Sequence, residues 1–350
     1  MTSPSNAAAP SAQELAQVAA DRSPRRRWPA LGFAIVVLAL ALLPAVSGAH
    51  LTGLVGRLLV FGLLAISLDL LWGYTGQLSL GHAAFFGLGA YAAGLILAEG
   101  QGIVPSLAAI VLAVGLPALL GLIMGYLLFR GGVGGVYFGI ITLLVSLLLE
   151  QLANTWTSFT GGSNGVLGIG PLELGFITVG SLHEAYYTIL VVVALAFLAV
   201  YWLTRTPFGR AMTAIRSHEH RAHSLGLSVV AIKTTVLTIS CGLAGLAGLL
   251  YVPLERFVYP TQLGLIASTG VVVWVVVGGR GTLVGPVIGA FAVEYLASAL
   301  SGTVRDYWTL ILGLFLIAIV VLRPGGLYGL LVSGWERTIA LARPRSRSDA

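Results

Sequence analysis

The chain has 350 residues, of which 57% are hydrophobic and only 9% are charged. A soluble domain carries about 25% charged residues, so this composition excludes an ordinary soluble enzyme and indicates a membrane protein. The formal net charge of +6 does not indicate nucleic-acid binding, because the basic residues form short clusters beside apolar runs, which is how membrane topology is encoded. Cys241 is the single cysteine, which excludes a disulfide framework and a thiolate metal site.

The N-terminal region begins with a polar stretch. Residues 1–27 are rich in Ala, Ser and Pro and lack apolar periodicity, so we expect a disordered cytoplasmic tail. Arg25–Arg27 then precede an apolar run that ends near Ser47-Gly48-Ala49, a pattern that resembles a cleavable signal peptide. We expect an uncleaved first span instead, because about 28 residues precede the run and many spans follow it.

Apolar segments recur along the rest of the chain. They lie near 31–47, 52–72, 80–98, 104–129, 135–154, 185–203, 234–252, 266–279, 283–300 and 307–322. Several are shorter than the roughly 20 residues that a perpendicular helix needs, and those at 80–98 and 266–279 are candidates for short, tilted or re-entrant helices. The predicted fold is an all-α, polytopic membrane protein with about 8–10 transmembrane or re-entrant helices. It occupies residues 28–330, and a basic cytoplasmic tail follows at 331–350.

Small residues are spaced for close helix packing. The chain contains 46 glycines, and pairs of small residues four positions apart let helices approach closely in lipid. Such pairs are Gly121/Gly125, Gly285/Gly289, Ala83/Gly87, Ala90/Gly94 and Ala244/Gly248. Together they predict a tightly packed helical bundle.

The distribution of basic residues sets the orientation. With both termini in the cytoplasm, all of the 19 Lys and Arg residues except Arg57, Arg256 and Arg305 fall on the cytoplasmic side, as the positive-inside rule requires. The loop 155–184 has no Lys or Arg and is predicted to be external, whereas the loop 204–233 holds five of the 19 and is predicted to be cytoplasmic.

Polar residues gather where the segment 73–82 connects two apolar runs. They are Tyr74, Thr75, Gln77, Ser79 and His82. One interpretation is a broken helix at membrane depth, which is tolerated where it is buried in protein or lines a cavity. The other is a cytoplasmic turn whose polar residues cap two helices, and both interpretations stay open.

Two further polar features lie elsewhere. The stretch 160–165, TGGSNG, predicts a turn. Three carboxylates, Asp69, Glu150 and Glu294, fall within or beside apolar segments, where ionisable groups are functional candidates. All three lie near predicted helix ends, so contact with water is an equally simple interpretation.

The cytoplasmic loop contains a predicted amphipathic helix from Gly209 to Leu225. One face carries Ala211, Ala214, Ile215, His218, Ala222 and Leu225 at helical spacing. Pro207 suits the start of this helix, and Gly226 suits its C′ position. The helix either lies on anionic lipid headgroups or inserts into a soluble partner. His218, His220 and His223 lack a carboxylate or thiolate pattern that would complete a metal site, so no metal is expected.

Motifs for catalysis are missing from the sequence. Lys233 is the single lysine, and no G-x-x-x-x-G-K-[ST] precedes it, so the chain cannot form a phosphate-binding P-loop. The chain also contains no H-E-x-x-H. We therefore expect a protein that is not an enzyme, and any ATP hydrolysis to take place on another chain.

Several stretches, in matching order, carry a resemblance to a known family. They are GYTGQLSLGHAAFFGLGAYAAG (73–94), GGVYFGIITL (134–143), TGGSNGV (160–166), TPFGRAMTAIRSHEHRAHSLGLSVVAIK (206–233), AGLAGLLY (244–251) and VGGRGTLVGPVIGAF (277–291). The chain resembles the permease subunits of bacterial ABC importers of the branched-chain amino acid type, the M-type member of the pair.

This resemblance implies a multi-pass subunit of the bacterial inner membrane. Its implied partners are two cytoplasmic ATPase subunits, a second related permease, an extracytoplasmic substrate-binding protein and membrane lipid, but no nucleic acid. It implies no directly bound cofactor, since the partner subunits use the ATP. It further implies that the cytoplasmic loop holds a coupling helix that docks on an ATPase, with Gly209, Arg210, Ala214, Ile215, Arg216, Glu219, Leu225 and Gly226 as coupling residues. Residues near the translocation path would be Tyr74, Thr75, Gln77, Ser79, His82, Tyr137 and Thr142.

Two departures from the family pattern keep the substrate open. The family usually has Asn where Asp69 stands, and the stretches 271–286 and 306–313 look closer to the urea-transport branch. An importer of urea or a short amide is therefore the first alternative to branched-chain amino acids. An ion-coupled secondary transporter is the second, although that class relies on intramembrane carboxylates or on helices broken at the midplane.

Overall fold

The computed structural model describes residues 30–175, 177–303, 313–314 and 326–330. The chain divides into two compact units, Met1–Val46 and Ser47–Ala350. In the first unit, α2 (Ala30–Val46) is an apolar helix that forms from the first predicted apolar segment. The predicted tails at 1–27 and 331–350 lie outside the described residues, as does the segment 307–322 apart from 313–314.

The second unit is a bundle of apolar helices, as the composition predicts. Each apolar segment expected between 52 and 300 forms one helix: α3 (Ala49–Thr75), α4 (Ala83–Glu99), α5 (Ile103–Arg130), α6 (Gly135–Thr155), α8 (Leu182–Arg205), α11 (Val229–Glu255), α12 (Leu265–Gly278) and α13 (Val284–Thr303). Among the described residues, 5 helices are long and apolar enough to cross a membrane, namely α3, α5, α6, α8 and α11. The predicted all-α, polytopic membrane fold is confirmed.

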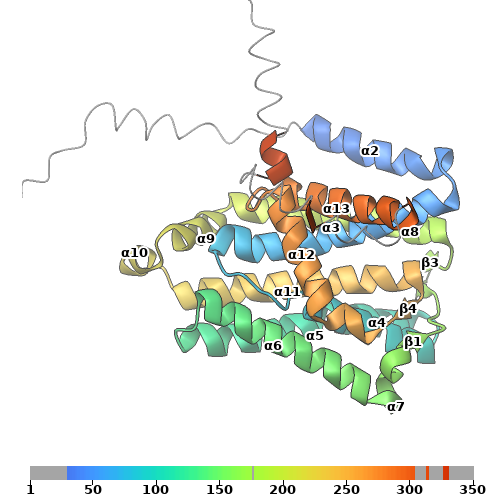
Figure 1. Ribbon diagram of the computed structural model, residues 1–350, viewed down its shortest axis with the longest axis horizontal. Helices are drawn as coiled ribbons and strands as arrows, with labels where there is room; N and C mark the ends of the chain where they lie inside the picture. The colour runs from blue at the N-terminus through green and yellow to red at the C-terminus, as the bar shows by residue number, and fades with distance from the viewer. Residues whose placement is uncertain (1–29, 176, 304–312, 315–325, 331–350) are drawn as a thin grey trace, which may run out of the picture. The chain divides into compact units, whose positions relative to one another are not determined.

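The helix α12 is one of the short segments that the sequence singled out. It has 14 residues, and at about 1.5 Å per residue it is shorter than the roughly 30 Å hydrocarbon core of a bilayer. In Figure 1 it runs steeply across the direction of α3 and α11. The helix α4, with 17 residues, is also short. Both are therefore shorter than a perpendicular span.

The interior of the bundle is built on α3 and α11. Within their most apolar windows, 78% of the α3 residues and 72% of the α11 residues are buried, against 28% for α5 and 28% for α6. Glycines let the helices around α11 come close. A Cβ added at Gly121 of α5 would lie 2.6 Å from Cys241 Sγ, and one at Gly248 of α11 would lie 2.7 Å from the backbone nitrogen of Ala90 in α4. The predicted close packing of small residues is confirmed at these helices.

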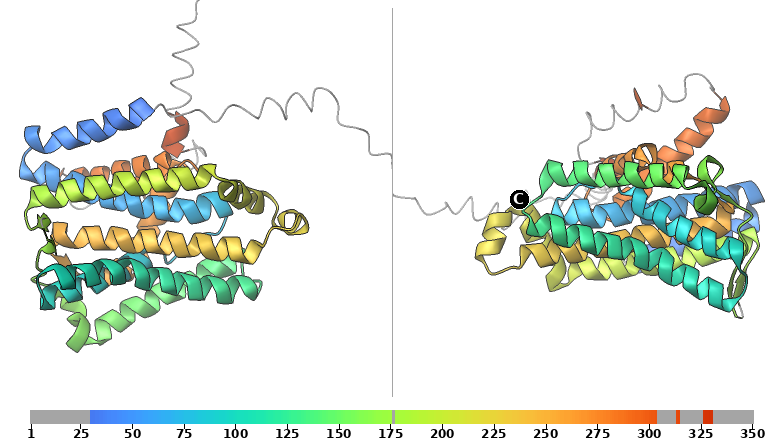
Figure 2. Two further views of the ribbon diagram at one scale, coloured as in Figure 1. Left: turned by 180° about the vertical axis from the view of Figure 1, so that it is seen from behind. Right: turned by 90° about the horizontal axis from the view of Figure 1, so that it is seen from below.

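The two ends of the bundle differ in character. One end carries the short helices α9 (Pro207–Ser217) and α10 (Glu219–Ser224), whereas the strands and α7 (Thr157–Thr160) lie at the other end (Figures 1 and 2). The basic end includes Arg130 at the end of α5 and Arg205 at the end of α8. At the opposite end Arg57 pairs with Glu255 at 2.6 Å. This separation is the one that the positive-inside rule predicts.

The external loop has more structure than the predicted turn. It holds α7, the 3₁₀ helix η1 (Gly162–Asn164) and the strands β1 (Val166–Leu167), β2 (Leu172–Leu174) and β3 (Ile177–Val179). Strand β1 pairs antiparallel with β4 (Phe257–Val258), which follows α11, and β2 pairs with β3. A second 3₁₀ helix, η2 (Pro260–Leu263), precedes α12. The predicted turn at 160–165 is present, with Gly161, Gly162 and Gly165 at positive φ.

Candidate functional site

The cytoplasmic segment forms two helices where the sequence predicted one. Helix α9 begins at Pro207, and the side chain of Thr206 caps it by accepting a hydrogen bond from the Gly209 nitrogen at 3.4 Å. His218 then adopts an extended backbone, with φ −155° and ψ 95°. The prediction of one continuous helix from Gly209 to Leu225 is therefore wrong at His218. The break redirects α10 so that Glu219 meets Lys233 of α11, a tertiary contact that helical spacing does not reveal.

The end of the segment follows the prediction for Gly226. This glycine has φ 84°, and its N–H donates to the carbonyl of His223 at 2.9 Å. The Leu227 N–H donates to the carbonyl of Ala222 at 3.2 Å. These two bonds form the Schellman arrangement, in which a glycine in the left-handed region ends a helix. The predicted C′ role of Gly226 is confirmed.

The predicted coupling residues divide into three groups. Gly209 and Ile215 are buried in their own chain. Arg216 donates from Nη1 to the carbonyl of Gly73 at the end of α3, and Glu219 pairs with Lys233. The remaining four predicted coupling residues are exposed: Arg210, Ala214, Leu225 and Gly226.

The predicted apolar face of the segment needs correction as well. Met212, Ile215 and Ala222 are the buried positions of α9 and α10 besides Gly209. Ala214, His218 and Leu225, which the single-helix pattern placed on that face, are exposed. The break at His218 accounts for the exposure of His218 and Leu225, because it changes the direction of the second helix; Ala214 lies before the break, on the exposed side of α9. Leu225 is 76% exposed, so an apolar side chain stands free at the end of a basic segment.

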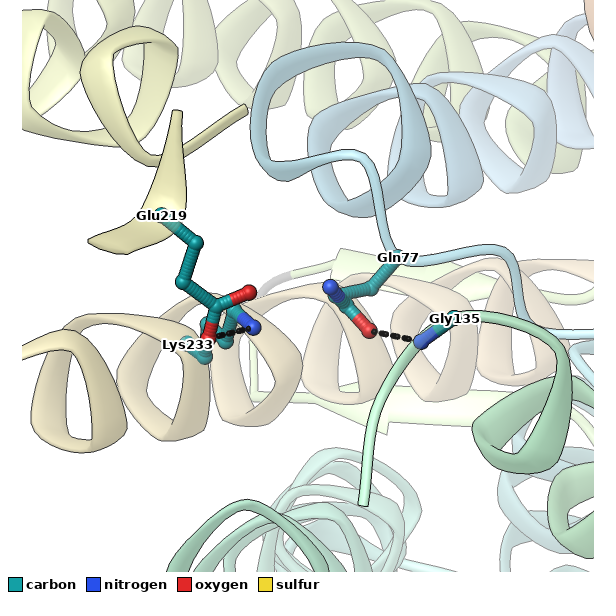
Figure 3. A network of polar contacts seen from close by, with 4 residues as sticks. All are labelled: Gln77, Gly135, Glu219 and Lys233. Carbon is teal, nitrogen blue, oxygen red and sulfur yellow. Dashed lines mark hydrogen bonds and ion pairs between the residues drawn. The ribbon is translucent and has the colours of Figure 1, made fainter. Parts of the chain in front are cut away.

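A pair of polar contacts lies where the segment meets the bundle (Figure 3). Lys233 Nζ donates to Glu219 Oε1 at 2.6 Å. Beside this pair, the Gly135 N–H at the start of α6 donates to Gln77 Oε1 at 3.3 Å. The Lys233 ammonium also lies 5.5 Å from the centre of the Phe129 ring in α5. A small cavity of about 80 Å³ lies between Phe129, Gly134, Glu219 and Lys233. These contacts join α10 to α11 beside the start of α6.

The Glu219–Lys233 pair gives a stability prediction. The Lys233 side chain is 4% exposed and that of Glu219 is 50% exposed. Removing one member of a fully buried pair costs about 3–5 kcal/mol, and the water that reaches Glu219 reduces this, so we expect Glu219→Gln to lower stability by about 1–2 kcal/mol. The measurement is the thermal midpoint of the detergent-solubilised chain. Glu99→Gln, at an exposed carboxylate, is the control and should leave the midpoint unchanged.

A second substitution separates the buried charge from the packing of the side chain. Lys233→Met in the Glu219→Gln background removes the unpaired ammonium and keeps an apolar stem of similar length. We expect it to recover most of the lost stability, because the desolvated charge and not the stem is the cause. Equal midpoints for Glu219→Gln and Glu99→Gln would contradict the role assigned to the pair.

The polar segment after α3 is buried inside the bundle. The helix ends at Thr75, and residues 76–82 run to the start of α4 without forming a helix. His82 Nε2 lies 2.9 Å from Ser67 Oγ of α3 and 3.4 Å from Ser240 Oγ of α11. The Leu80 N–H donates to Thr142 Oγ1 of α6 at 3.1 Å. These three contacts favour the broken-helix interpretation over a solvated cytoplasmic turn, since a buried break needs such partners for its polar groups.

The remaining residues predicted near the translocation path lie in different environments. Thr75, Gln77, Ser79, His82 and Thr142 are all buried. Tyr74 is half-buried, whereas Tyr137 on α6 is 74% exposed. Two buried polar atoms in the segment, Ser79 Oγ and His82 Nδ1, have no hydrogen-bond partner. The structure therefore brings five of the predicted residues into one buried region and leaves Tyr137 outside it.

Comparison with known proteins identifies the chain. The family model described as "Branched-chain amino acid transport system / permease component" matches residues 50–320. The chain belongs to this family. The match runs from the start of α3 past the end of α13, so it includes both the cytoplasmic segment and the buried polar segment. The chain is thus a multi-pass membrane permease component of the bacterial inner membrane.

Individual relatives of this family agree with the match. The chain is 30% identical to the high-affinity branched-chain amino acid transport system permease protein LivM of Salmonella typhimurium, over 77% of this chain and 68% of the relative. It is 29% identical to the LivM protein of Escherichia coli over the same shares. It is also 28% identical to the ribose import permease protein RbsC of Haemophilus influenzae, over 65% of this chain and 74% of that protein. No solved structure matches the chain.

Several residues of the site escaped the sequence prediction. Ser67 and Ser240 contact His82 of the buried segment, and Ser268 accepts a hydrogen bond from the nitrogen of Ala83, which follows it, but a serine in an apolar helix is too common to be a signal. The sequence predicts Lys233 in the cytoplasmic loop, whereas it lies inside α11 and is 3% exposed. Asp69 is fully buried, so contact with water, the simple interpretation of this carboxylate, is wrong. Helix α3 extends past it to Thr75.

Proposed function

We propose that the chain is the permease subunit of an ATP-driven importer that carries branched-chain amino acids across the bacterial inner membrane. The family match over residues 50–320 carries this proposal. The LivM relatives are named for branched-chain amino acid transport, and this favours the same substrate here. The ribose permeases among the relatives show that related proteins handle other solutes, which is why the substrate needs a direct test.

Two cytoplasmic ATPase subunits are the proposed source of energy. The chain has no P-loop, so hydrolysis belongs to a partner. We propose that the ATPase docks on α9 and α10, where Arg210, Ala214 and Leu225 are exposed. A second related permease and an extracytoplasmic binding protein would complete the importer. Exposed apolar and basic groups on a short segment suit a lipid surface as well as a protein, so the family match favours the protein partner.

The contacts of the segment suggest how movement would enter the bundle. Helix α9 follows α8 directly through the Thr206 cap. Arg216 holds α9 to the end of α3, and Glu219 holds α10 to α11. A displacement of the docked helices would thus act on α3, α8 and α11 together. Helices α3 and α11 contact the buried polar segment through Ser67 and Ser240. A movement of the docked helices would therefore be passed on to the proposed translocation path.

The translocation path itself requires a conformational change on this proposal. Thr142 is 1% exposed, and its hydroxyl accepts the hydrogen bond of Leu80. Ser146, one turn further along α6, donates to the carbonyl of Leu263 at 2.5 Å. A movement of α6 that breaks these bonds would expose the polar groups behind it. The state described here is then one in which the path is closed within this subunit.

Reconstituted transport tests the proposed function. The complex is purified from its native host after mild solubilisation and placed in proteoliposomes with ATP inside and the binding protein outside. We expect leucine uptake that requires ATP, resists an ionophore and is not reduced by excess urea. Uptake of urea in place of leucine would assign the urea alternative. Uptake without ATP that collapses with an ionophore would overturn the ATP-driven importer.

A further inference from the structure

A buried carboxylate of α3 binds the loop between α12 and α13. Asp69 of α3 accepts hydrogen bonds from the Gly281 nitrogen at 2.6 Å and from the Leu283 nitrogen at 3.1 Å, one on each carboxylate oxygen. Its side chain is fully buried. A buried carboxylate is costly unless strong donors satisfy it, and backbone N–H groups bound to an ionised carboxylate form such charge-assisted bonds. The loop thus supplies the partners that let Asp69 be buried.

The loop has an unusual backbone conformation that needs support. Leu283 has φ 59°, and Gly279 and Gly281 have φ 113° and 81°. A bulky residue in the left-handed region is an outlier that strains the backbone. The Leu283 side chain is 2% exposed. The hydrogen bond from Leu283 to Asp69 therefore holds the strained residue of the loop.

The same turn of α3 also contacts the cytoplasmic segment. Arg216 of α9 donates to the carbonyl of Gly73. A Cβ added at Gly73 would collide with Asp69 Oδ1 and would lie 2.8 Å from the Gly281 nitrogen, and one added at Gly281 would lie 2.9 Å from Arg216 Nη1. Glycine at these two positions lets the carboxylate, the loop and the guanidinium pack directly on one another.

The charges at this junction also interact. The Arg280 guanidinium lies 5.0 Å from the centre of the Trp72 ring in α3. Partial burial and the positive charge of Arg216 lower the pKa of Arg280, whereas the negative charge of Asp69 raises it. The loop is therefore attached to the end of α3 by a ring contact as well as by the carboxylate.

We propose that Asp69 is a positioning residue that fastens the α12–α13 loop to the last turns of α3, so that a movement of α9, attached to the same turn through Arg216, carries α12 and α13 with it. This proposal rests on the proposed function. It gives this chain's departure from the family's usual Asn a structural meaning: both carboxylate oxygens of Asp69 accept N–H bonds, whereas an amide offers one acceptor oxygen and its NH₂ group would face the second N–H donor. Asp69→Asn should then leave the helices in place but loosen the loop.

The test measures the number of leucine molecules taken up per ATP hydrolysed by the reconstituted importer. We expect Asp69→Asn to lower this ratio roughly tenfold, which is the size of effect of one lost hydrogen bond to a charged group. A loss of folded complex lowers uptake and hydrolysis in proportion and leaves the ratio unchanged. The matched control is Glu255→Gln, which removes a carboxylate from the ion pair with Arg57 at the opposite end of α3 and should keep the wild-type ratio.

A second variant tests the route through α9. Arg216→Gln should lower the ratio by itself, and adding Asp69→Asn should lower it little further, because both side chains lie on one route. Effects that multiply would overturn the single route. If Asp69→Asn alone does not assemble, Leu283→Gly is added, since glycine adopts a positive φ without steric cost, and the double variant should assemble with a low ratio.

Failure of this proposal is distinguishable from failure of the proposed function. A wild-type complex that shows no ATP-driven uptake would overturn the importer function itself. A wild-type complex that transports, together with an Asp69→Asn variant, or its Leu283→Gly double variant, that keeps the wild-type ratio, would overturn the role of Asp69 alone.

Discussion

Replacing Leu225 with aspartate should release the ATPase subunits from the complex and abolish ATP-driven leucine uptake. Leu225 is 76% exposed at the end of α10, on the surface proposed for docking. Burying a leucine side chain in a partner contributes about 1.5–3 kcal/mol. An unpaired carboxylate in the same place costs several kcal/mol more. Together these effects correspond to a loss of roughly a hundredfold or more in affinity.

The measurement is the amount of ATPase that purifies with the tagged permease after mild solubilisation. The matched control is Leu167→Asp, because Leu167 is 67% exposed in β1 at the opposite end of the bundle. The control should retain the ATPase, and its helix content by circular dichroism should equal that of the test variant. Equal retention of the ATPase by both variants would contradict docking on α10.

The helices could be predicted from the sequence because each one depends on the length and apolar character of its own segment. An apolar run of sufficient length forms a helix in a bilayer, where every backbone polar group needs an internal partner. For this reason the segment expected at 234–252 corresponds to α11, although the helix begins earlier, at Val229. The cap at Gly226 was predictable for a similar reason, since a residue that ends a helix in the left-handed backbone region is usually glycine.

The parts that could not be predicted depend on contacts between distant residues. The break at His218 accompanies the ion pair between Glu219 and Lys233, and nothing in the spacing of the segment specifies it. The strand pair β1–β4 joins residues that lie on either side of α8 and α11. Asp69 and Leu283 are 214 residues apart. Each of these contacts exists only after the helices have packed.

The candidate site shows the same division. Its residue types were visible in the sequence as polar groups between apolar runs. Their environment was not, because five of the predicted path residues are enclosed by other helices of the same chain. Tyr137, which the sequence placed with them, is exposed on α6. The sequence pattern therefore shows which polar residues the segment contains, whereas helix packing decides which of them can contact a solute.

The second large effect is expected from Gly248→Ala in α11. A Cβ at this position would collide with the Phe86 carbonyl and would lie 2.7 Å from the Ala90 nitrogen and 3.2 Å from the Gly89 carbonyl carbon. All three are backbone atoms of α4, so no side chain can rotate away and the two helices must separate. Overpacking of this kind typically lowers the free energy of unfolding by about 1–3 kcal/mol. Because the contacts are with backbone atoms, we expect Gly248→Ala to cost an amount at or above the upper end of this range.

Gly115→Ala in α5 provides the comparison for Gly248→Ala. Gly115 is an exposed glycine in a helix with no atom within 4 Å of an added Cβ, and alanine forms helix better than glycine by about 0.5–1 kcal/mol. We expect a thermal midpoint of the solubilised chain that is unchanged or higher for Gly115→Ala. For Gly248→Ala we expect a midpoint lower by roughly 5 °C or more, or no folded protein. Equal midpoints would mean that α4 and α11 do not pack through their backbones.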